Sequence, residues 1–215
     1  MKKRLFVTLL ISILIILSLQ FSSFAVIDQA QLFLSTDFQN DSSATQAMKY
    51  GVKTFQTLGY NITSGNILRR YIITNSKSTV LNYISGTGNN YAFLVSSHGN
   101  SNCFAMQNGN SSSYIYPSDI SGYWHFVFLD SCSSMANDSF ARAFRTTGYD
   151  YRASFGWYTT VTTSGSEEWW SHFKDVAGTT NIRSACLAAA DQCSNSTPIR
   201  IYGDKTWDGK AWDKN

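Results

Sequence analysis

The clearest hydrophobic pattern in the chain is a pair of short, continuous apolar runs, YAFLVS at residues 91–96 and HFVFL at residues 125–129. Neither run alternates between apolar and polar positions, which is typical of strands that are buried on both faces in a parallel sheet covered by helices. The segment between them, residues 99–122, is rich in Gly, Ser and Asn and has no periodicity. We expect it to form a loop, and long loops in compact domains are often functional.

Helix-like and strand-like patterns alternate along the rest of the chain. In residues 43–58, for example, Ala47, Val52 and Phe55 share one helical face, and Gly59 supplies a stop. The predicted helices are 43–58, 76–84, 136–145, 167–176 and 182–190, and the further predicted strands are 31–38, 67–73, 152–158 and 199–202. This order predicts one α/β domain, a three-layer α/β/α sandwich around a mostly parallel sheet.

The N-terminus has the pattern of a secretory signal peptide. Three basic residues at positions 2–4 precede an apolar run over residues 5–19, and Ala25 stands at a small-residue cleavage position. We expect cleavage after Ala25, so that residues 1–25 are the signal peptide and residues 26–215 are an exported domain, secreted or held at the cell surface. The alternative is an uncleaved membrane anchor, although the run is short for a span of about 20 residues. No later stretch is apolar enough to cross a bilayer.

Removal of the signal peptide changes the charge balance, because its only charged residues are basic. The mature chain then carries 14 Lys and Arg against 14 Asp and Glu and is formally neutral. A neutral surface with no basic run gives no electrostatic reason to expect binding to nucleic acids or to anionic membranes. We therefore set both aside as partners.

A His and a Cys follow the two buried strands. The first strand runs into Ser97-His98-Gly99 and the second into Asp130-Ser131-Cys132. The carboxyl ends of parallel strands meet at one edge of a sheet, where sites form, and neighbouring strands lie about 5 Å apart. An imidazole beside a thiol can take its proton for attack on a carbonyl and later protonate the leaving amine. His98 and Cys132 are therefore the candidate catalytic pair.

Further candidates lie around this pair. Because Gly99 has no Cβ, a substrate carbonyl can approach the backbone there, and we expect the N–H groups of Gly99 and Cys132 to stabilise an oxyanion. Asp130 lies two residues before Cys132, which places a carboxylate near the nucleophile. Asp37, at the end of the first predicted strand, is the candidate for orienting His98.

The two strand-end blocks, FLVSSHGN and FVFLDSCSS, resemble those of the caspase-like cysteine peptidases, a group that includes metacaspases, clostripain, gingipains and legumains. The later segments GWYTTVTTSGSEEWWSHF and IRIYGDKTW are similar to gingipain-like segments, so the resemblance covers most of residues 30–206. It implies a caspase-like (flavodoxin-like) sandwich and a secreted cysteine endopeptidase that acts on proteins or peptides and needs no cofactor or metal. It also implies that Asp130 lines a pocket for an Arg or Lys side chain. Where the metacaspase motif has His after the Cys, this chain has Ser133.

Other interpretations of the same residues stay open. Asp130 can instead cap the turn or helix that follows its strand, since Asp is a favoured N-cap residue. The domain can be a caspase-like fold that no longer cleaves and serves as a binding or adhesion module, and a disulfide between Cys103 and Cys132 would favour that reading. It can also be a sortase-like transferase that uses the same thioester intermediate. A zinc site of His98, Cys103 and Cys132 has no paired-ligand spacing to support it.

The remaining histidines and cysteines fit structural roles. His125 begins its strand, about 20 Å from Cys132 by strand rise, and His172 stands on a predicted helix at a spacing suited to a surface pair. Cys186 and Cys193 lie seven residues apart in a predicted helix and cannot bridge each other unless that helix stops between them. The chain contains neither the G-x-S-x-G of serine hydrolases nor a G-x-x-x-x-G-K phosphate loop.

Overall fold

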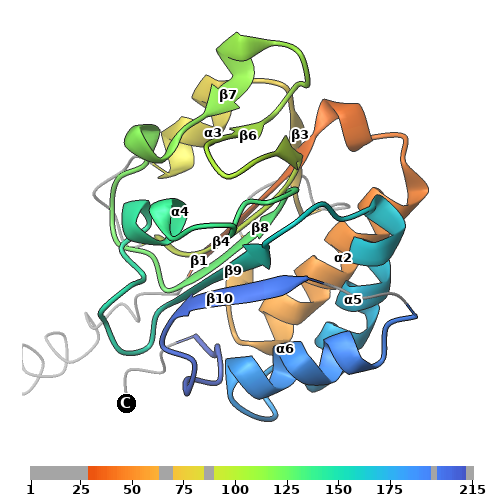
Figure 1. The fold of residues 1–215 in the computed structure, drawn as a ribbon, viewed down its shortest axis with the longest axis vertical. Helices are drawn as coiled ribbons and strands as arrows, with labels where there is room; N and C mark the ends of the chain where they lie inside the picture. The colour runs from red at the N-terminus through yellow and green to blue at the C-terminus, as the bar shows by residue number, and fades with distance from the viewer. Residues whose placement is uncertain (1–28, 63–69, 85–89, 195–197, 212–215) are drawn as a thin grey trace, which may run out of the picture.

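A computed structural model describes residues 29–62, 70–84, 90–194 and 198–211 of the chain. Its centre is a sheet with the strand order β10-β9-β8-β4-β1-β2, in which β3 also pairs with β1 (Figure 1). The strands are β1 (Gln29–Ser35), β2 (Asn61–Ile62), β3 (Ile72–Thr74), β4 (Asn90–Ser96), β8 (Phe126–Asp130), β9 (Ala153–Trp157) and β10 (Ile199–Gly203). The described pairs are parallel except for β9 with β10, which is antiparallel. The predicted mostly parallel sheet is therefore confirmed.

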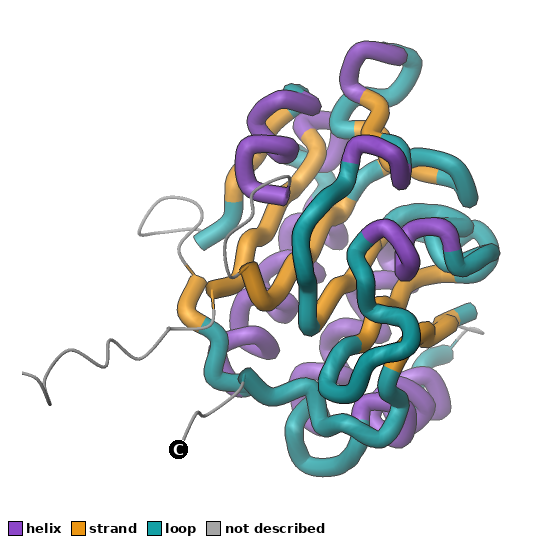
Figure 2. Tube along the Cα trace, turned by 90° about the vertical axis from the view of Figure 1, so that its left-hand side faces the viewer, coloured by secondary structure: helices purple, strands orange, loops and turns teal. Residues whose placement is uncertain are grey.

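Helices cover both faces of this sheet (Figures 1 and 2). One face carries α2 (Ser42–Thr57), α5 (Thr163–Val176) and α6 (Ile182–Asp191), and the other carries α3 (Lys77–Ile84) and α4 (Ser139–Ala143). The second face also carries a small antiparallel sheet of β5 (His98–Gly99), β6 (Phe104–Ala105) and β7 (Tyr114–Ile115). Single turns of 3₁₀ helix lie at Thr36–Phe38, Ser111–Ser113 and Pro117–Asp119. The chain thus folds as the predicted three-layer α/β/α sandwich.

The central strands are apolar throughout because they face two cores. In β4, Leu94 packs into the core beneath α2, α5 and α6, whereas Phe93 and Val95 pack into the core beneath α3 and α4. All three side chains are fully buried. Successive side chains of a strand point to opposite faces, so burial of both faces requires an unbroken apolar run rather than an alternating one.

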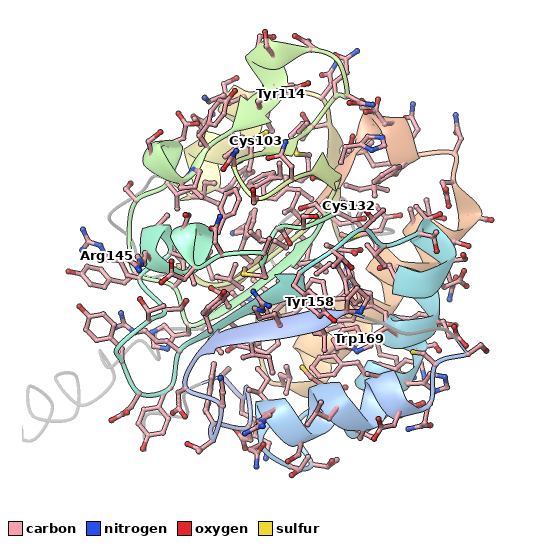
Figure 3. The ribbon with its side chains drawn as sticks, in the orientation of Figure 1. Cys103, Tyr114, Cys132, Arg145, Tyr158 and Trp169 are labelled. Atoms are coloured by element: carbon pink, nitrogen blue, oxygen red, sulfur yellow. The ribbon has the colours of Figure 1, made fainter. Side chains whose placement is uncertain are left out.

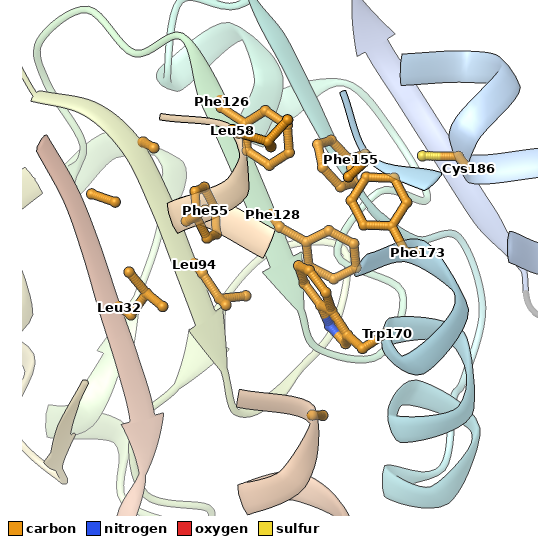
Figure 4. Packing of buried hydrophobic residues seen from close by; sticks show 14 of the residues in the cluster. Leu32, Phe55, Leu58, Leu94, Phe126, Phe128, Phe155, Trp170, Phe173 and Cys186 are labelled. Carbon is orange, nitrogen blue, oxygen red and sulfur yellow. The ribbon is translucent and has the colours of Figure 1, made fainter. Parts of the chain in front are cut away.

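Aromatic rings fill the core beneath α2, α5 and α6 (Figure 4). The ring of Phe128 on β8 lies at the centre, with its centroid 4.7 Å from those of Phe155 and Trp170 and 5.3 Å from that of Trp169. Such aromatic pairs contribute about 0.5–1.5 kcal/mol each beyond the area that they bury. This packing fixes β8, whose last residue is Asp130, against α5.

Two element boundaries near the sheet edge differ from the prediction. The strand predicted over 31–38 ends at Ser35, because the Ser35 hydroxyl accepts the Asp37 N–H at 3.2 Å and starts a 3₁₀ turn. The helix predicted over 136–145 is reduced to α4, since turns and bends occupy residues 131–138.

The loop predicted over residues 99–122 is wrong in part. The strands β6 and β7 pair within it, and Phe104, Met106 and Ile115 are buried in the core beneath α3 and α4. Part of the strand predicted over 67–73, residues 67–69, lies outside the described residues, as does the predicted signal peptide. Within the described ranges, no helix has both the length and the apolar character to span a membrane.

The first prediction concerns His125, which precedes β8. Burial and the nearby Arg152 guanidinium lower the pKa of His125 from its ordinary value of 6.5 to about 4. The folded state therefore disfavours the protonated imidazole, so the stability is fully present above pH 6.5 and falls as the pH drops from 6.5 toward 4. After discounting for solvent screening, we expect His125 to lower the free energy of unfolding by on the order of 1 kcal/mol over this window. The variant His125→Asn should lack this contribution.

Urea unfolding of the wild type and of His125→Asn at pH 7.5 and at pH 4.5 measures this difference. A His125→Asn variant that loses stability between the two pH values as steeply as the wild type would contradict the assignment.

Candidate active site

The pairing of β4 with β8 brings His98 and Cys132 to one edge of the sheet. Ser96 is the partner of Asp130 in this parallel pair, and the Ser97 N–H donates to the Asp130 carbonyl at 3.1 Å. His98 and Cys132 each lie two residues beyond the Ser96–Asp130 pair. Both residues line each of two hollows at this edge. Figure 3 shows Cys132 where the chain leaves β8. The structure thus brings the predicted catalytic pair together.

The imidazole of His98 packs against the 3₁₀ turn that follows β1. Its ring centroid lies 4.6 Å from that of Phe38, with the two planes inclined by 52°. Its Nε2 atom lies 3.9 Å from Oδ2 of Asp37, and the same oxygen accepts the Asn108 N–H at 2.6 Å. The predicted orienting residue is therefore adjacent to His98, at a distance longer than a hydrogen bond.

Cys132 stands in a tight turn directly after β8. Its Sγ donates to the Val161 carbonyl at 3.4 Å. The next residue, Ser133, has φ of 55°, a left-handed conformation that is uncommon for residues other than Gly, and its N–H donates to the Thr159 carbonyl at 2.9 Å. Conformations of this kind cost on the order of 1–3 kcal/mol and persist where the surroundings impose them. The backbone conformation of this turn therefore fixes the position of the Cys132 thiol.

Gly99 occupies a position with no room for a side chain. A Cβ there would lie 2.8 Å from both Cβ and Oγ of Ser131 and 3.1 Å from the Cys103 carbonyl oxygen. The Asn100 N–H donates to that carbonyl at 2.9 Å. Along an antiparallel pair, residues whose backbone groups bond to the partner strand alternate with residues whose groups point away from it. Because Asn100 bonds to Cys103, the N–H of the preceding residue, Gly99, points away from β6. The predicted oxyanion donor is thus directed out of the small sheet.

Two hollows flank the pair, and His98 and Cys132 are the residues that the two linings share. The first, of about 260 Å³, is otherwise lined by residues 38, 44, 96–97, 130–131, 161–163 and 166. The second, of about 180 Å³, is otherwise lined by Gly99, Asn100, Cys103, Ala105, Asn108 and Tyr114. His98 and Cys132 therefore lie where the two hollows meet.

Asp130 lies in the wall of the first hollow and is 5% exposed. Its carboxylate accepts the Trp157 indole N–H at 2.7 Å and the Ser166 hydroxyl at 2.8 Å. Burial raises the pKa of the Asp130 carboxyl, while the hydrogen bonds from Trp157, Ser166 and Ser96 oppose that rise. The capping interpretation is wrong, because these partners come from β4, β9 and α5 and not from the turn that follows β8.

The four cysteines are free. Cys103 and Cys132 therefore lack the disulfide that would favour a binding module. Burial raises the pKa of the Cys103 and Cys186 thiols, which keeps them protonated. In the part of the chain that the structure describes, no group of three or more His, Cys, Asp and Glu side chains is placed to hold a metal ion.

Several residues of the site were missed by sequence reasoning. Trp157 and Ser166 donate to the Asp130 carboxylate, and the Val161 carbonyl accepts from the Cys132 thiol. All three lie in the segment GWYTTVTTSGSEEWWSHF, but its pattern does not mark any of them as a site residue. Ser96 was within reach of prediction, because it ends the same strand that leads to His98. The others come together only through the pairing of β8 with β9 and the docking of α5.

No protein-family model matches this chain, and no curated protein matches it in sequence. The interpretation of the site therefore depends on its geometry and on the chemistry of its side chains.

Gly99→Ala tests the close approach of β5 to the turn before Cys132. The added methyl meets Ser131 at 2.8 Å, so we expect at least a hundredfold loss of any activity that depends on the Gly99 N–H. Ser131→Gly in the same chain removes both contacting atoms of Ser131, and the double variant should recover part of this loss. Turnover and the melting temperature of both variants are the measurements. An equal loss in the single and double variants would show that the Ser131 contact is not the cause.

Proposed function

We propose that the exported domain is a cysteine endopeptidase of caspase-like type, with Cys132 and His98 as a catalytic dyad. The observation that supports this best is that two hollows meet at these two residues. A peptidase must hold substrate on both sides of the bond that it cuts, with the nucleophile between them. The equal offset of both residues from the Ser96–Asp130 pair supports the same assignment.

The acylation step follows from the roles of the side chains. His98 takes the thiol proton, and Sγ of Cys132 attacks the carbonyl carbon of the scissile amide, so that an S–C bond forms and negative charge moves to the carbonyl oxygen. The N–H groups of Gly99 and Cys132 stabilise this oxyanion. Its collapse breaks the C–N bond, and the proton carried by His98 passes to the departing amine. Because Nε2 faces Asp37, Nδ1 is the nitrogen assigned to this exchange.

Deacylation uses the same groups in reverse order. His98 takes a proton from a water molecule, and the resulting hydroxide attacks the thioester carbonyl. The C–S bond breaks, the acid product leaves, and the proton returns to the Cys132 sulfur. This sequence requires no cofactor and no metal ion.

Asp130 supports a preference for Arg or Lys before the cut bond. Its carboxylate lies in the wall of the first hollow, and a positive side chain entering that space would supply the countercharge that a buried carboxylate lacks. The donors from Trp157 and Ser166 hold the carboxylate oxygens in place. An electrically neutral residue before the cut bond would supply no such countercharge.

The dyad is tested with the purified chain of residues 26–215 and fluorogenic peptide amides that end in Arg, Lys, Asn or Asp. We expect Cys132→Ala and His98→Ala each to lower kcat/KM by about 10³-fold or more. Cys193→Ala is the matched control, because Cys193 lies beside the end of α6 and does not line either hollow. Turnover that survives in Cys132→Ala would exclude this residue as the nucleophile, and an inactive, folded, reduced wild type would favour a binding module.

The role of Asp130 is tested by its replacement with Asn, which keeps the shape and removes the charge. We expect the ratio of kcat/KM for Arg over Gln amides to fall by about 10²-fold in Asp130→Asn, because the countercharge is lost. Asp138→Asn, a surface carboxylate paired with Arg142, should leave the ratio unchanged. An unchanged ratio in Asp130→Asn would show that this carboxylate only holds Trp157 and Ser166 in place and does not select the substrate.

A further inference from the structure

Three exposed tyrosines and two arginines form one surface at the edge of the sheet opposite the dyad. Tyr123 precedes β8, and the turn between α4 and β9 supplies Arg145, Tyr149, Tyr151 and Arg152. Because β8 and β9 are parallel, residues that precede them lie at the edge away from their carboxyl ends. We call these five residues the Tyr–Arg surface. The tyrosines are 52%, 51% and 48% exposed, so their rings are open to a ligand, and Figure 3 shows Arg145 on the outside of the molecule.

The guanidinium groups of this surface stack on its tyrosine rings. Cζ of Arg145 lies 4.6 Å from the centroid of the Tyr123 ring. Cζ of Arg152 lies 5.3 Å from that centroid and 4.7 Å from the centroid of the Tyr149 ring. The Arg152 guanidinium also donates to the Arg145 carbonyl at 3.4 Å. Cations and rings therefore alternate along the surface, and these contacts hold the side chains in place before a ligand binds.

The two positive charges have no carboxylate partner. Among the residues that the structure describes, every ion pair involves other side chains. Both guanidiniums lie over the Tyr123 ring, so their charges repel each other at short range. The charge of Arg152 also reaches His125, whose pKa is lowered by burial and, after that, by this guanidinium. An anion bound beside both guanidiniums would remove the repulsion, and their planar forks match a carboxylate.

The turns that carry these side chains have an uncommon backbone conformation. Arg145 has φ of 54° and Tyr151 has φ of 59°, both in the left-handed region that favours Gly. Arg145 follows the last turn of α4, where the Thr146 N–H donates back to the Ala141 carbonyl at 3.0 Å and Gly is the usual residue. A long charged side chain there costs stability that Gly would avoid. Residues held in such conformations are concentrated at functional sites.

The make-up of the surface favours a polysaccharide over a protein. A stable protein interface takes about 20–30 residues a side and has an apolar centre, whereas this surface is small and has polar groups at every side-chain tip. An exposed tyrosine ring can stack against the C–H face of a sugar ring. The alternation of rings with guanidiniums matches a chain in which each sugar carries a carboxylate. We propose that the Tyr–Arg surface binds an acidic polysaccharide built from uronic-acid units.

Soluble polygalacturonate and its methyl ester test this inference, because the ester keeps the sugar rings and removes the charges. Titration calorimetry with the chain of residues 26–215 should give a Kd at least about tenfold lower for the acid. Arg145→Gln should weaken binding of the acid about tenfold and leave binding of the ester unchanged, whereas Tyr149→Ala should weaken both. Arg142→Gln is the matched control, since Arg142 stands on α4 and is already paired with Asp138.

A further variant protects the test against misfolding. Asp150 is exposed in the same turn as Tyr149 and Tyr151, and its carboxylate opposes an acidic ligand. Asp150→Asn should therefore bind the acid more tightly than the wild type, a gain that a damaged fold cannot produce. Equal losses in Arg145→Gln and Arg142→Gln would overturn the inference.

Polyglutamate is the probe that separates a sugar chain from an acidic peptide. Binding of polyglutamate as tight as that of polygalacturonate would overturn the inference in favour of a peptide ligand. Equal affinity for the acid and the ester, or no binding of either polymer, would overturn it as well. Because each measurement is of binding alone, none of these outcomes bears on the proposed peptidase activity.

Discussion

The register between β4 and β8 is the constraint on which the site depends. Because side chains alternate along a strand, a slip of one residue would move every core side chain to the other face. Here both faces are sealed, with Leu94 in one core and Phe93 in the other, so a slip would cost the packing of two layers at once. The pairing of Ser96 with Asp130 is thereby fixed. Because these are the last residues of β4 and β8, the two segments that follow begin side by side at the same edge of the sheet.

The sequence was most informative where burial is complete. The unbroken apolar runs of β4 and β8 allowed their existence and their burial in a parallel sheet to be predicted, because few other structures bury both faces of a short segment. Predictions were weaker at the edge of the sheet. Ser35 ends β1 through a single side-chain hydrogen bond, and β6 buries Phe104 within a segment that is otherwise polar. Neither feature produces a periodic signal.

The candidate site divides in the same way. His98, Gly99 and Cys132 were predictable because they follow recognisable strands, and Asp37 because it follows the first strand on the same edge. The partners of Asp130 were not, since Trp157 and Ser166 reach it from 27 and 36 residues away through β9 and α5. Side chains that come together through long-range docking leave no spacing to read, so the surroundings of a reactive group are harder to predict than the group itself.

The absence of disulfides among the four cysteines has a consequence for the conditions that the domain tolerates. Its stability comes from two aromatic and aliphatic cores and from hydrogen bonds, none of which a reductant can break. A thiol reagent strong enough to reverse oxidation of Cys132 therefore acts on that residue without loosening the scaffold. Many small secreted domains require an oxidising medium to stay folded, whereas here the redox state of Cys132 and the integrity of the fold are independent of each other.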